Sequence, residues 1–203
     1  MNNFVYDFVK VTATVPGLLW FRPKWIYCGE RAKEKIRGGA LVISNHNGYV
    51  DPVLLMGAIW YRRHRFVCTK EFFEKPVSAF FFRNFHCIPI DRDNFGFGSL
   101  KEIIRALKGG AIVSIFPEGH IVSDERALET FKSGVVLMAL QGGVPVVPVY
   151  LEKRKNPWHR QKFVIGEPID PTSFFGPRPT LEQMNTISEI IRKEEDKLKH
   201  YAE

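Results

Sequence analysis

His46 and Asp51 stand five positions apart in the stretch SNHNGYVDP, residues 44–52. An imidazole whose Nδ1–H is held by a carboxylate has a fixed tautomer, and its Nε2 is left to take a proton from a hydroxyl. The carboxylate also stabilises the imidazolium that forms on proton uptake. The two residue types therefore suit an oriented general base. Taken one at a time, they are just as typical of a loop histidine and a helix-capping aspartate.

This pair has to be positioned by a turn between two elements, because residues five apart lie about 140° apart around a helix axis and cannot share one of its faces. The apolar run of residues 39–44 predicts a buried strand, and the apolar run after Pro52 predicts a helix. We expect Asp51 to be the N-cap of that helix and Pro52 its first residue. The turn at residues 47–49 can then fold His46 back against Asp51.

Composition sets wider bounds on the class of protein. The chain has 203 residues, of which 45% are hydrophobic and 25% charged, so we expect one ordered domain. Its three cysteines form no CxxC pair, which indicates neither a disulfide framework nor a structural zinc site and favours a reducing cytosol. The net charge of +7 indicates an anionic partner. Charge alone does not choose between nucleic acid, a phospholipid surface and a phosphorylated substrate.

Residues 1–25 form an apolar segment that we expect to associate with a membrane surface, ahead of the domain at residues 26–203. The segment carries only Asp7 and Lys10 as charges before Pro16, where we expect a helix to break. No uninterrupted apolar run is long enough for a spanning helix, whereas aromatic rings beside basic side chains suit the headgroup layer. The alternative is that its apolar side chains pack on the domain. The aromatic and basic residues that end the segment are Trp20, Phe21, Arg22, Lys24 and Trp25.

The rest of the chain alternates apolar runs of strand length with helical periodicity. This pattern predicts an α/β fold, a single domain with a largely βα-alternating central sheet flanked by helices. In such sheets ligands gather at the carboxyl ends of the strands, so the loops after the strands are considered together. The expected strands are residues 41–44, 66–69, 87–90, 112–116, 146–150 and 163–165. The expected helices are residues 52–61, 70–82 with an interruption at Pro76, 98–108, 131–141 and 181–199.

Polar residues follow three of these strands. Lys70 follows the second, Arg92 the third, and Glu118-Gly119 the fourth. The Arg92 guanidinium offers a planar fork for bidentate phosphate contact, and Lys70 offers a point charge for the same anion. The Glu118 carboxylate can accept from a substrate hydroxyl, and Gly119 permits close backbone approach. Each of these residues is also compatible with an ordinary surface charge or turn.

Four blocks in this order, SNHNGYVDP, IPIDRDN, IFPEG and VPVVPV, resemble those of the glycerolipid acyltransferase family, whose hallmark is H-x-x-x-x-D followed by an FPEG loop. The resemblance covers residues 39–149 and looks like the 1-acylglycerol-3-phosphate acyltransferase type. It implies transfer of a fatty acyl group from a thioester, on CoA or acyl carrier protein, to a hydroxyl of lysophosphatidic acid. It implies no metal and no cofactor, and a peripheral or monotopic place at the cytoplasmic face of the cell membrane.

The resemblance also implies a role for each matching residue. In that scheme His46 is the base that deprotonates the acceptor hydroxyl, and Asp51 orients it. Arg92 binds the phosphate of the acceptor, with Lys70 as a second cation. The residues implied to shape the acceptor site are Glu118 and Gly119.

The chain departs from the family pattern after FPEG, where the family usually continues with Thr-Arg-Ser and this chain has HIVS, residues 120–123. The second phosphate-binding arginine is therefore missing. This weakens the case for a phosphomonoester and leaves another lysophospholipid or lipid hydroxyl open as the acceptor. Lys132, in a family-like FKSG segment, or Arg126 could reach the same anion, and His120 is a further candidate for the site.

Two other classes of function remain open from the sequence. A metal-dependent hydrolase could use His46 and Asp51 with a further histidine, although no HExxH spacing supports it. A non-catalytic basic module would explain the charge, but it has no use for the His46–Asp51 pair. No RNP, helix-turn-helix or zinc signature occurs, so we do not expect nucleic acid as the partner. The histidines on which the hydrolase would draw are His64, His86 and His120.

Overall fold

The computed structural model describes residues 3–91, 97–116, 125–156 and 158–202, and of residues 125–133 it describes the backbone alone. Within these residues the centre is a seven-stranded sheet in the order β1-β7-β6-β2-β5-β3-β4. The strands β2 to β6 are all parallel, whereas β7 pairs antiparallel with β6 and parallel with β1. The expected α/β class is confirmed. The strands are β1 Lys24–Tyr27, β2 Ala40–Ser44, β3 His64–Thr69, β4 Ile88–Ile90, β5 Ile112–Ile115, β6 Val146–Leu151 and β7 Lys162–Ile165.

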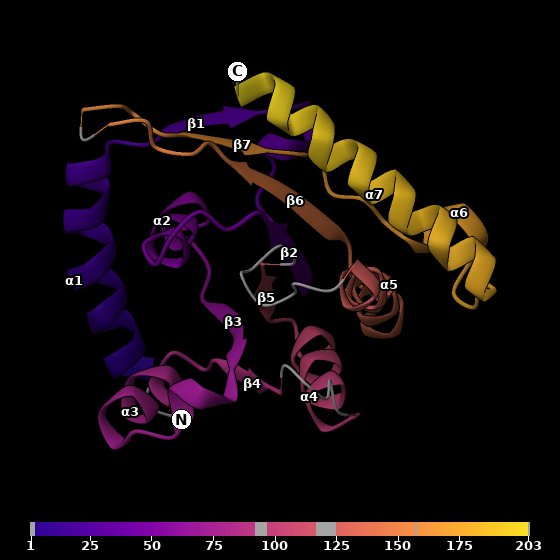
Figure 1. The fold of residues 1–203 in the computed structure, drawn as a ribbon, viewed down its shortest axis with the longest axis horizontal. Helices are drawn as coiled ribbons and strands as arrows, with labels where there is room; N and C mark the ends of the chain where they lie inside the picture. Colours follow the sequence, from indigo (N-terminus) through magenta and orange to yellow (C-terminus); the bar gives the residue numbers. More distant parts are fainter. Residues whose placement is uncertain (1–2, 92–96, 117–124, 157, 203) are drawn as a thin grey trace.

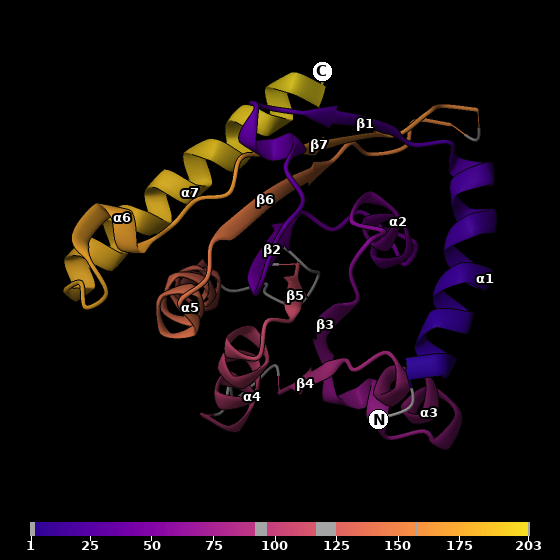
Figure 2. The same ribbon diagram turned by 180° about the vertical axis from the view of Figure 1, so that it is seen from behind.

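Helices cover both faces of this sheet (Figure 1). On the face under α1 and α2 the buried side chains of β2 are Ala40 and Val42, and on the face under α4, α5 and α7 they are Leu41 and Ile43. A parallel strand covered on both faces has to be apolar throughout, and all of β2 is buried. Figure 2 shows both layers from behind. The helices are α1 Asn3–Phe21, α2 Asp51–Ala58, α3 Pro76–Asn84, α4 Phe97–Lys108, α5 Glu125–Gly142, α6 Thr172–Phe175 and α7 Leu181–Ala202, with 3-10 turns η1 Arg31–Lys33 and η2 Lys70–Phe73.

The helix α1 differs from the prediction, because it runs through Pro16 and ends only at Phe21. Proline removes one helical hydrogen bond, but here the following turn packs tightly on α2. A Cβ at position 57 would come within 2.8 Å of Leu18 Cδ2, so Gly57 leaves the room that the Leu18 side chain occupies. Tertiary packing of the last turn therefore overrides the local break signal at Pro16.

One side of α1 is bound to the domain and the other faces outward. Tyr6 is fully buried, and Lys10 Nζ donates to the backbone carbonyls of Trp60 and Arg62 at 2.5 and 2.9 Å. By length and composition only, this helix of 19 residues could also cross a membrane. The outward side is apolar. Its exposed large apolar side chains are Phe4, Phe8, Val11, Val15, Leu19 and Trp20.

The strand β1 is a second difference from the prediction. Its Trp25 was expected in a membrane interface but is half-buried, with its ring centroid 4.9 Å from that of Phe163. The expected boundary after residue 25 therefore falls inside the sheet. The interruption expected at Pro76 is the start of α3, where a proline is tolerated because its missing N–H has no helical partner.

His64 begins β3 in a fully buried position. Its Nδ1 lies 2.8 Å from Ser114 Oγ, and its backbone N–H donates to Tyr6 Oη at 2.8 Å. Burial, together with the nearby positive charge of Lys10, lowers the pKa of His64 to about 3. The imidazole is therefore neutral in the folded protein at pH 7.

We predict that His64 makes the fold sensitive to mild acid. The unfolded chain protonates this side chain near the ordinary pKa of about 6.5, while the folded protein holds it neutral down to about 3, so stability falls as the pH drops through this window. Between pH 6.5 and pH 5 the loss is about 2 kcal/mol. Urea unfolding of the wild type and His64→Gln at pH 7 and pH 5 measures it. The wild type should lose about 2 kcal/mol more than the variant, and equal losses would contradict the assignment.

Candidate active site

The loop of residues 45–50 joins the carboxyl end of β2 to α2. Three of its groups contact one carboxylate oxygen, Asp51 Oδ2. His46 Nδ1 lies 2.8 Å from this oxygen. The backbone N–H groups of Asn47 and Gly48 donate to it at 2.6 and 2.7 Å. The structure thus brings His46 and Asp51 into contact and folds the loop around that contact.

Asp51 corrects one prediction. It is the first residue of α2 and Val50 is the N-cap, so the expected capping role is wrong by one position. The carboxylate binds the loop that precedes the helix instead of the first helical turn. Its negative charge is stabilised by the three donors and by the positive end of the helix dipole. Because the N–H groups of Asn47 and Gly48 already serve Asp51, donors to a reaction oxyanion have to come from elsewhere.

The contact determines which nitrogen of His46 is basic. An ionised carboxylate only accepts, so Nδ1 carries the hydrogen of the neutral ring and Nε2 has the available lone pair. The His46 side chain is 24% exposed, while that of Asp51 is 5% exposed. A hydroxyl can therefore approach the imidazole while the orienting carboxylate stays out of water, which is the arrangement that general-base catalysis requires.

Phe116 packs against the imidazole. The two ring centroids are 4.6 Å apart with an interplanar angle of 25°. Phe116 follows β5, which is the neighbour of β2 in the sheet, and it is the second residue of the IFPEG block. The blocks SNHNGYVDP and IFPEG, which follow neighbouring strands, are thus in contact through these two rings.

Two asparagines that the sequence did not single out for a role anchor the loop to β6. Asn45 Nδ2 donates to the Leu151 carbonyl at 2.9 Å, and Asn45 Oδ1 accepts from the Leu151 N–H at 2.7 Å. Asn47 Nδ2 donates to the same carbonyl at 2.8 Å. Leu151 lies more than a hundred positions away along the chain, so no local pattern reveals the contact. The only sign of this anchoring in the sequence is that an asparagine stands on each side of the candidate base.

Lys70 lies at the same edge of the sheet. It follows β3, and its Nζ lies 2.5 Å from Oδ2 of Asp91, which follows β4. In the order β2-β5-β3-β4, β3 stands two strands from β2, about 10 Å away at the usual strand spacing. Lys70 therefore brings a positive charge, paired with Asp91, to the end of a strand about 10 Å from β2. Arg92, Glu118 and Gly119 lie outside the described residues, as do Arg126 and Lys132 as far as their side chains are concerned.

Of the histidines of the hydrolase alternative, the two that the structure describes do not lie at His46. His64 is buried at the start of β3, and His86 precedes β4, with its ring centroid 5.6 Å from that of Tyr6. Both stand at the amino ends of strands parallel to β2, whereas His46 follows the carboxyl end of β2. His120 lies outside the described residues.

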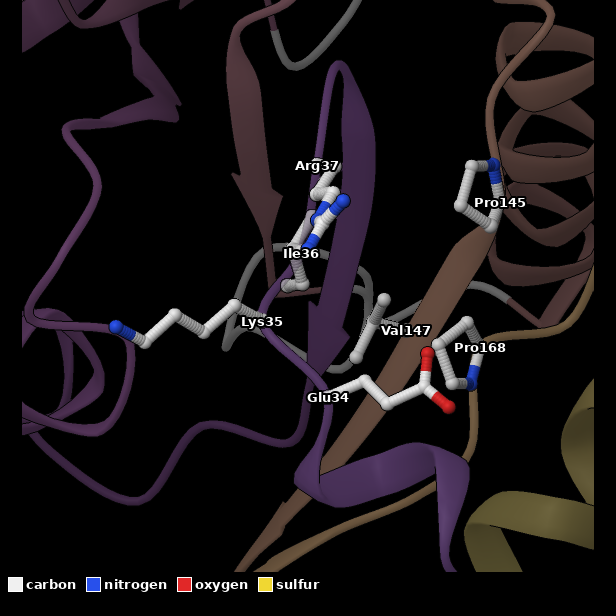
Figure 3. A pocket seen from close by; sticks show the side chains of 7 residues that line it. All are labelled: Glu34, Lys35, Ile36, Arg37, Pro145, Val147 and Pro168. Carbon is white, nitrogen blue, oxygen red and sulfur yellow. The ribbon is translucent and has the colours of Figure 1, made fainter.

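A cavity of about 620 Å³ lies between the segments that precede β2 and β6 (Figure 3). Ile36 and Arg37 on its wall precede β2, and Pro145 precedes β6. It therefore opens at the amino ends of the parallel strands, opposite the edge that carries His46. Its lining residues are Glu34, Lys35, Ile36, Arg37, Pro145, Val147 and Pro168.

Known acyltransferases match most of this chain. The family model described as Acyltransferase matches residues 28–152, which include the His46 loop, Lys70 and Leu151. A 1-acyl-sn-glycerol-3-phosphate acyltransferase of Bacillus subtilis is 32% identical over 161 residues, covering 76% of this chain and 78% of that protein. One from Limnanthes douglasii is 30% identical over 70% of this chain, and the chain spans 52% of its length.

The fold is also that of a solved structure. The crystal structure of the 1-acyl-sn-glycerophosphate acyltransferase from Thermotoga maritima superposes with a TM-score of 0.61 over 94% of this chain and 78% of that one, at 22% identity. The matched family model covers more than half of the chain, and the Bacillus relative extends over most of both proteins. The chain therefore belongs to the acyltransferase family, and it is an enzyme of acyl transfer.

Proposed function

We propose that the enzyme transfers a fatty acyl group from an acyl thioester to a hydroxyl of 1-acylglycerol-3-phosphate, with His46 as general base. The contact of His46 Nδ1 with Asp51 at 2.8 Å carries this proposal, because it holds the ring with Nε2 available to a hydroxyl. The names of the relatives from Bacillus and Limnanthes support this acceptor. The donor in this proposal is acyl-CoA or acyl carrier protein charged with a fatty acid.

In the proposed reaction His46 Nε2 takes the proton of the acceptor hydroxyl as its oxygen attacks the thioester carbonyl carbon. Asp51 stabilises the imidazolium that results. The tetrahedral intermediate then expels the thiolate as the carbon–sulfur bond breaks, and His46 returns its proton to the sulfur. The products are the new ester and the free thiol. The thioester is already activated, so this scheme uses neither a metal nor a covalent enzyme intermediate.

The acceptor phosphate is proposed to bind at the edge beyond β3. Lys70 lies there against Asp91, the residue that precedes Arg92 in the IPIDRDN block. Arg92 adds a planar fork that suits phosphate, and Glu118 and Gly119 shape the other side of the acceptor site. Lys132 is the candidate for the anion contact that the missing second arginine would otherwise supply.

Another lysophospholipid is the second candidate acceptor, favoured by the sequence HIVS at residues 120–123. Losing one phosphate-binding cation suits a phosphodiester, which carries one negative charge, better than a phosphomonoester. Purified enzyme with acyl-CoA and acyl carrier protein thioesters, tested against a panel of lysolipids with products read by mass, distinguishes the two. Fastest turnover of 1-acylglycerol-3-phosphate supports the first proposal, and preference for a lysophosphodiester overturns it.

We predict that His46→Ala lowers kcat/KM by about 10²-fold or more, because it removes the general base. The fold should persist, since the side chain is partly exposed, and circular dichroism checks this. His200→Ala, an exposed histidine of α7, is the matched control and should keep wild-type activity. Full activity in the His46 variant would reject the mechanism.

We predict that Asn45→Ala lowers kcat about tenfold with a smaller change in KM. The substitution removes both hydrogen bonds to Leu151, each worth about 1 kcal/mol, and so loosens the loop that positions His46. Asn185→Ala, on the exposed side of α7, is the control. A variant that melts earlier but keeps its kcat would show that the contact serves stability alone.

We predict that Arg92→Ala raises KM for a phosphorylated acceptor at least about tenfold more than for a neutral acceptor, because a charge-assisted contact contributes about 1.5–3 kcal/mol. Arg105→Ala, exposed on α4, should leave both KM values unchanged. Steady-state kinetics on the two acceptors supplies the comparison. An equal effect on both would argue against phosphate binding by Arg92.

A further inference from the structure

The loop between β6 and β7 starts where the His46 loop is anchored. Leu151, the last residue of β6, holds Asn45 and Asn47, and the connecting residues follow at once. Lys153, Lys155 and Arg160 of this connection are exposed. Trp158 stands among them with 82% of its surface exposed. Three basic side chains and a large aromatic ring are thus presented to the outside beside the candidate active site.

The acidic residue of this loop faces inward. Glu152 is 8% exposed, accepts from the Lys162 N–H at 3.1 Å and lies 3.0 Å from His159 Nε2. Burial opposes its charge, but the hydrogen bonds from His159 and Lys162 outweigh burial and lower its pKa. Lys155 reaches the carboxylate only at 3.8 Å from a side chain that is 74% exposed, a pair that solvent screens. The outward charge of the loop is therefore positive.

The loop is also attached to the end of α1. Arg160 Nε donates to the Arg22 carbonyl at 3.0 Å, and the Arg154 guanidinium lies 4.4 Å from the centre of the Phe21 ring. Figures 1 and 2 both show the loop meeting the C-terminal end of α1. On that helix the outward apolar side ends in Leu19 and Trp20, which are 73% and 69% exposed. The outward apolar side of α1 therefore adjoins the basic and aromatic side chains of the β6–β7 loop.

We propose that Lys153, Lys155, Trp158 and Arg160 form a contact surface for anionic lipid headgroups of a bilayer. Lys and Arg side chains are attracted to the negative surface potential of an anionic leaflet, and tryptophan prefers the same depth. The surface acts together with the outward side of α1, which supplies the apolar contact. The role of this surface rests on the proposed function, because the surface would bring an acceptor dissolved in the bilayer to the His46 loop, which is anchored at Leu151.

A bilayer suits these residues better than an acidic protein partner does. An acidic protein would need only the positive charges, whereas here the charges adjoin the exposed apolar side chains of α1 and an exposed tryptophan. Apolar and basic groups on one continuous surface match the acyl boundary and the headgroups of a single leaflet.

The test is the binding of the full chain to vesicles, without turnover. The triple variant Lys153→Gln, Lys155→Gln, Arg160→Gln is compared with a control of equal charge change, Lys101→Gln, Lys193→Gln, Lys199→Gln, whose sites on α4 and α7 are exposed. On phosphatidylcholine vesicles containing phosphatidylglycerol, the triple variant should bind at least about tenfold more weakly than wild type, and the control within about twofold. On pure phosphatidylcholine all three proteins should bind alike.

Equal binding of the triple variant and its control to anionic vesicles would overturn the proposal. So would a triple variant that loses binding to acyl carrier protein but keeps it to anionic vesicles, because the surface would then serve the acidic protein. If losing the Arg160 contact unfolds the chain, the double variant Lys153→Gln, Lys155→Gln keeps that contact and should still bind several-fold more weakly. Acyl transfer to a dispersed short-chain acceptor, measured separately, tests the proposed function independently of vesicle binding.

Discussion

One carboxylate oxygen organises the candidate site. Asp51 Oδ2 receives the imidazole of His46 and the backbone N–H groups of Asn47 and Gly48, so a single buried charge determines the path of the loop and the orientation of the ring together. Charge-assisted hydrogen bonds of this kind are about twice as strong as neutral ones, and each keeps the others in place by fixing the same atom. Anything that moves the start of α2 therefore moves the candidate base as well.

The parallel sheet explains why distant parts of the chain meet around the His46 loop. Parallel strands end at one edge, so the carboxyl ends of β2, β5, β3 and β4 are neighbours even though these strands are far apart in sequence. His46, Phe116 and Lys70 follow three of these strands in spatial order. The amides of Asn45 and Asn47 then extend the row to β6 through Leu151. The His46 loop is therefore contacted from both sides, by Phe116 after β5 and by Leu151 of β6.

The sequence predicted the parts of this arrangement that depend on local chemistry. The strands from β2 to β7 were expected because apolar, β-branched runs signal them, and the meeting of His46 and Asp51 followed from a turn between a strand and a helix. The strand β1 was missed because it has only four residues, KWIY, and begins with a charged one. The helix break expected at Pro16 was wrong because packing of Leu18 against Gly57 keeps the last turn of α1 helical. The anchors at Leu151 were missed because they join positions far apart along the chain.

The same contacts bear on how α1 can meet a membrane. Its length and hydropathy alone would allow it to cross a bilayer, but Tyr6 is hydrogen bonded to the His64 backbone and Lys10 to two carbonyls in the turn after α2. A crossing helix would have to give up these bonds and bring the Lys10 charge into hydrocarbon, at a cost of several kcal/mol. Lying along the domain keeps the bonds and still offers the apolar outward side to lipid. In the proposed orientation the membrane then meets α1 and the β6–β7 loop on one surface, and the His46 loop is anchored at Leu151, where the β6–β7 loop begins.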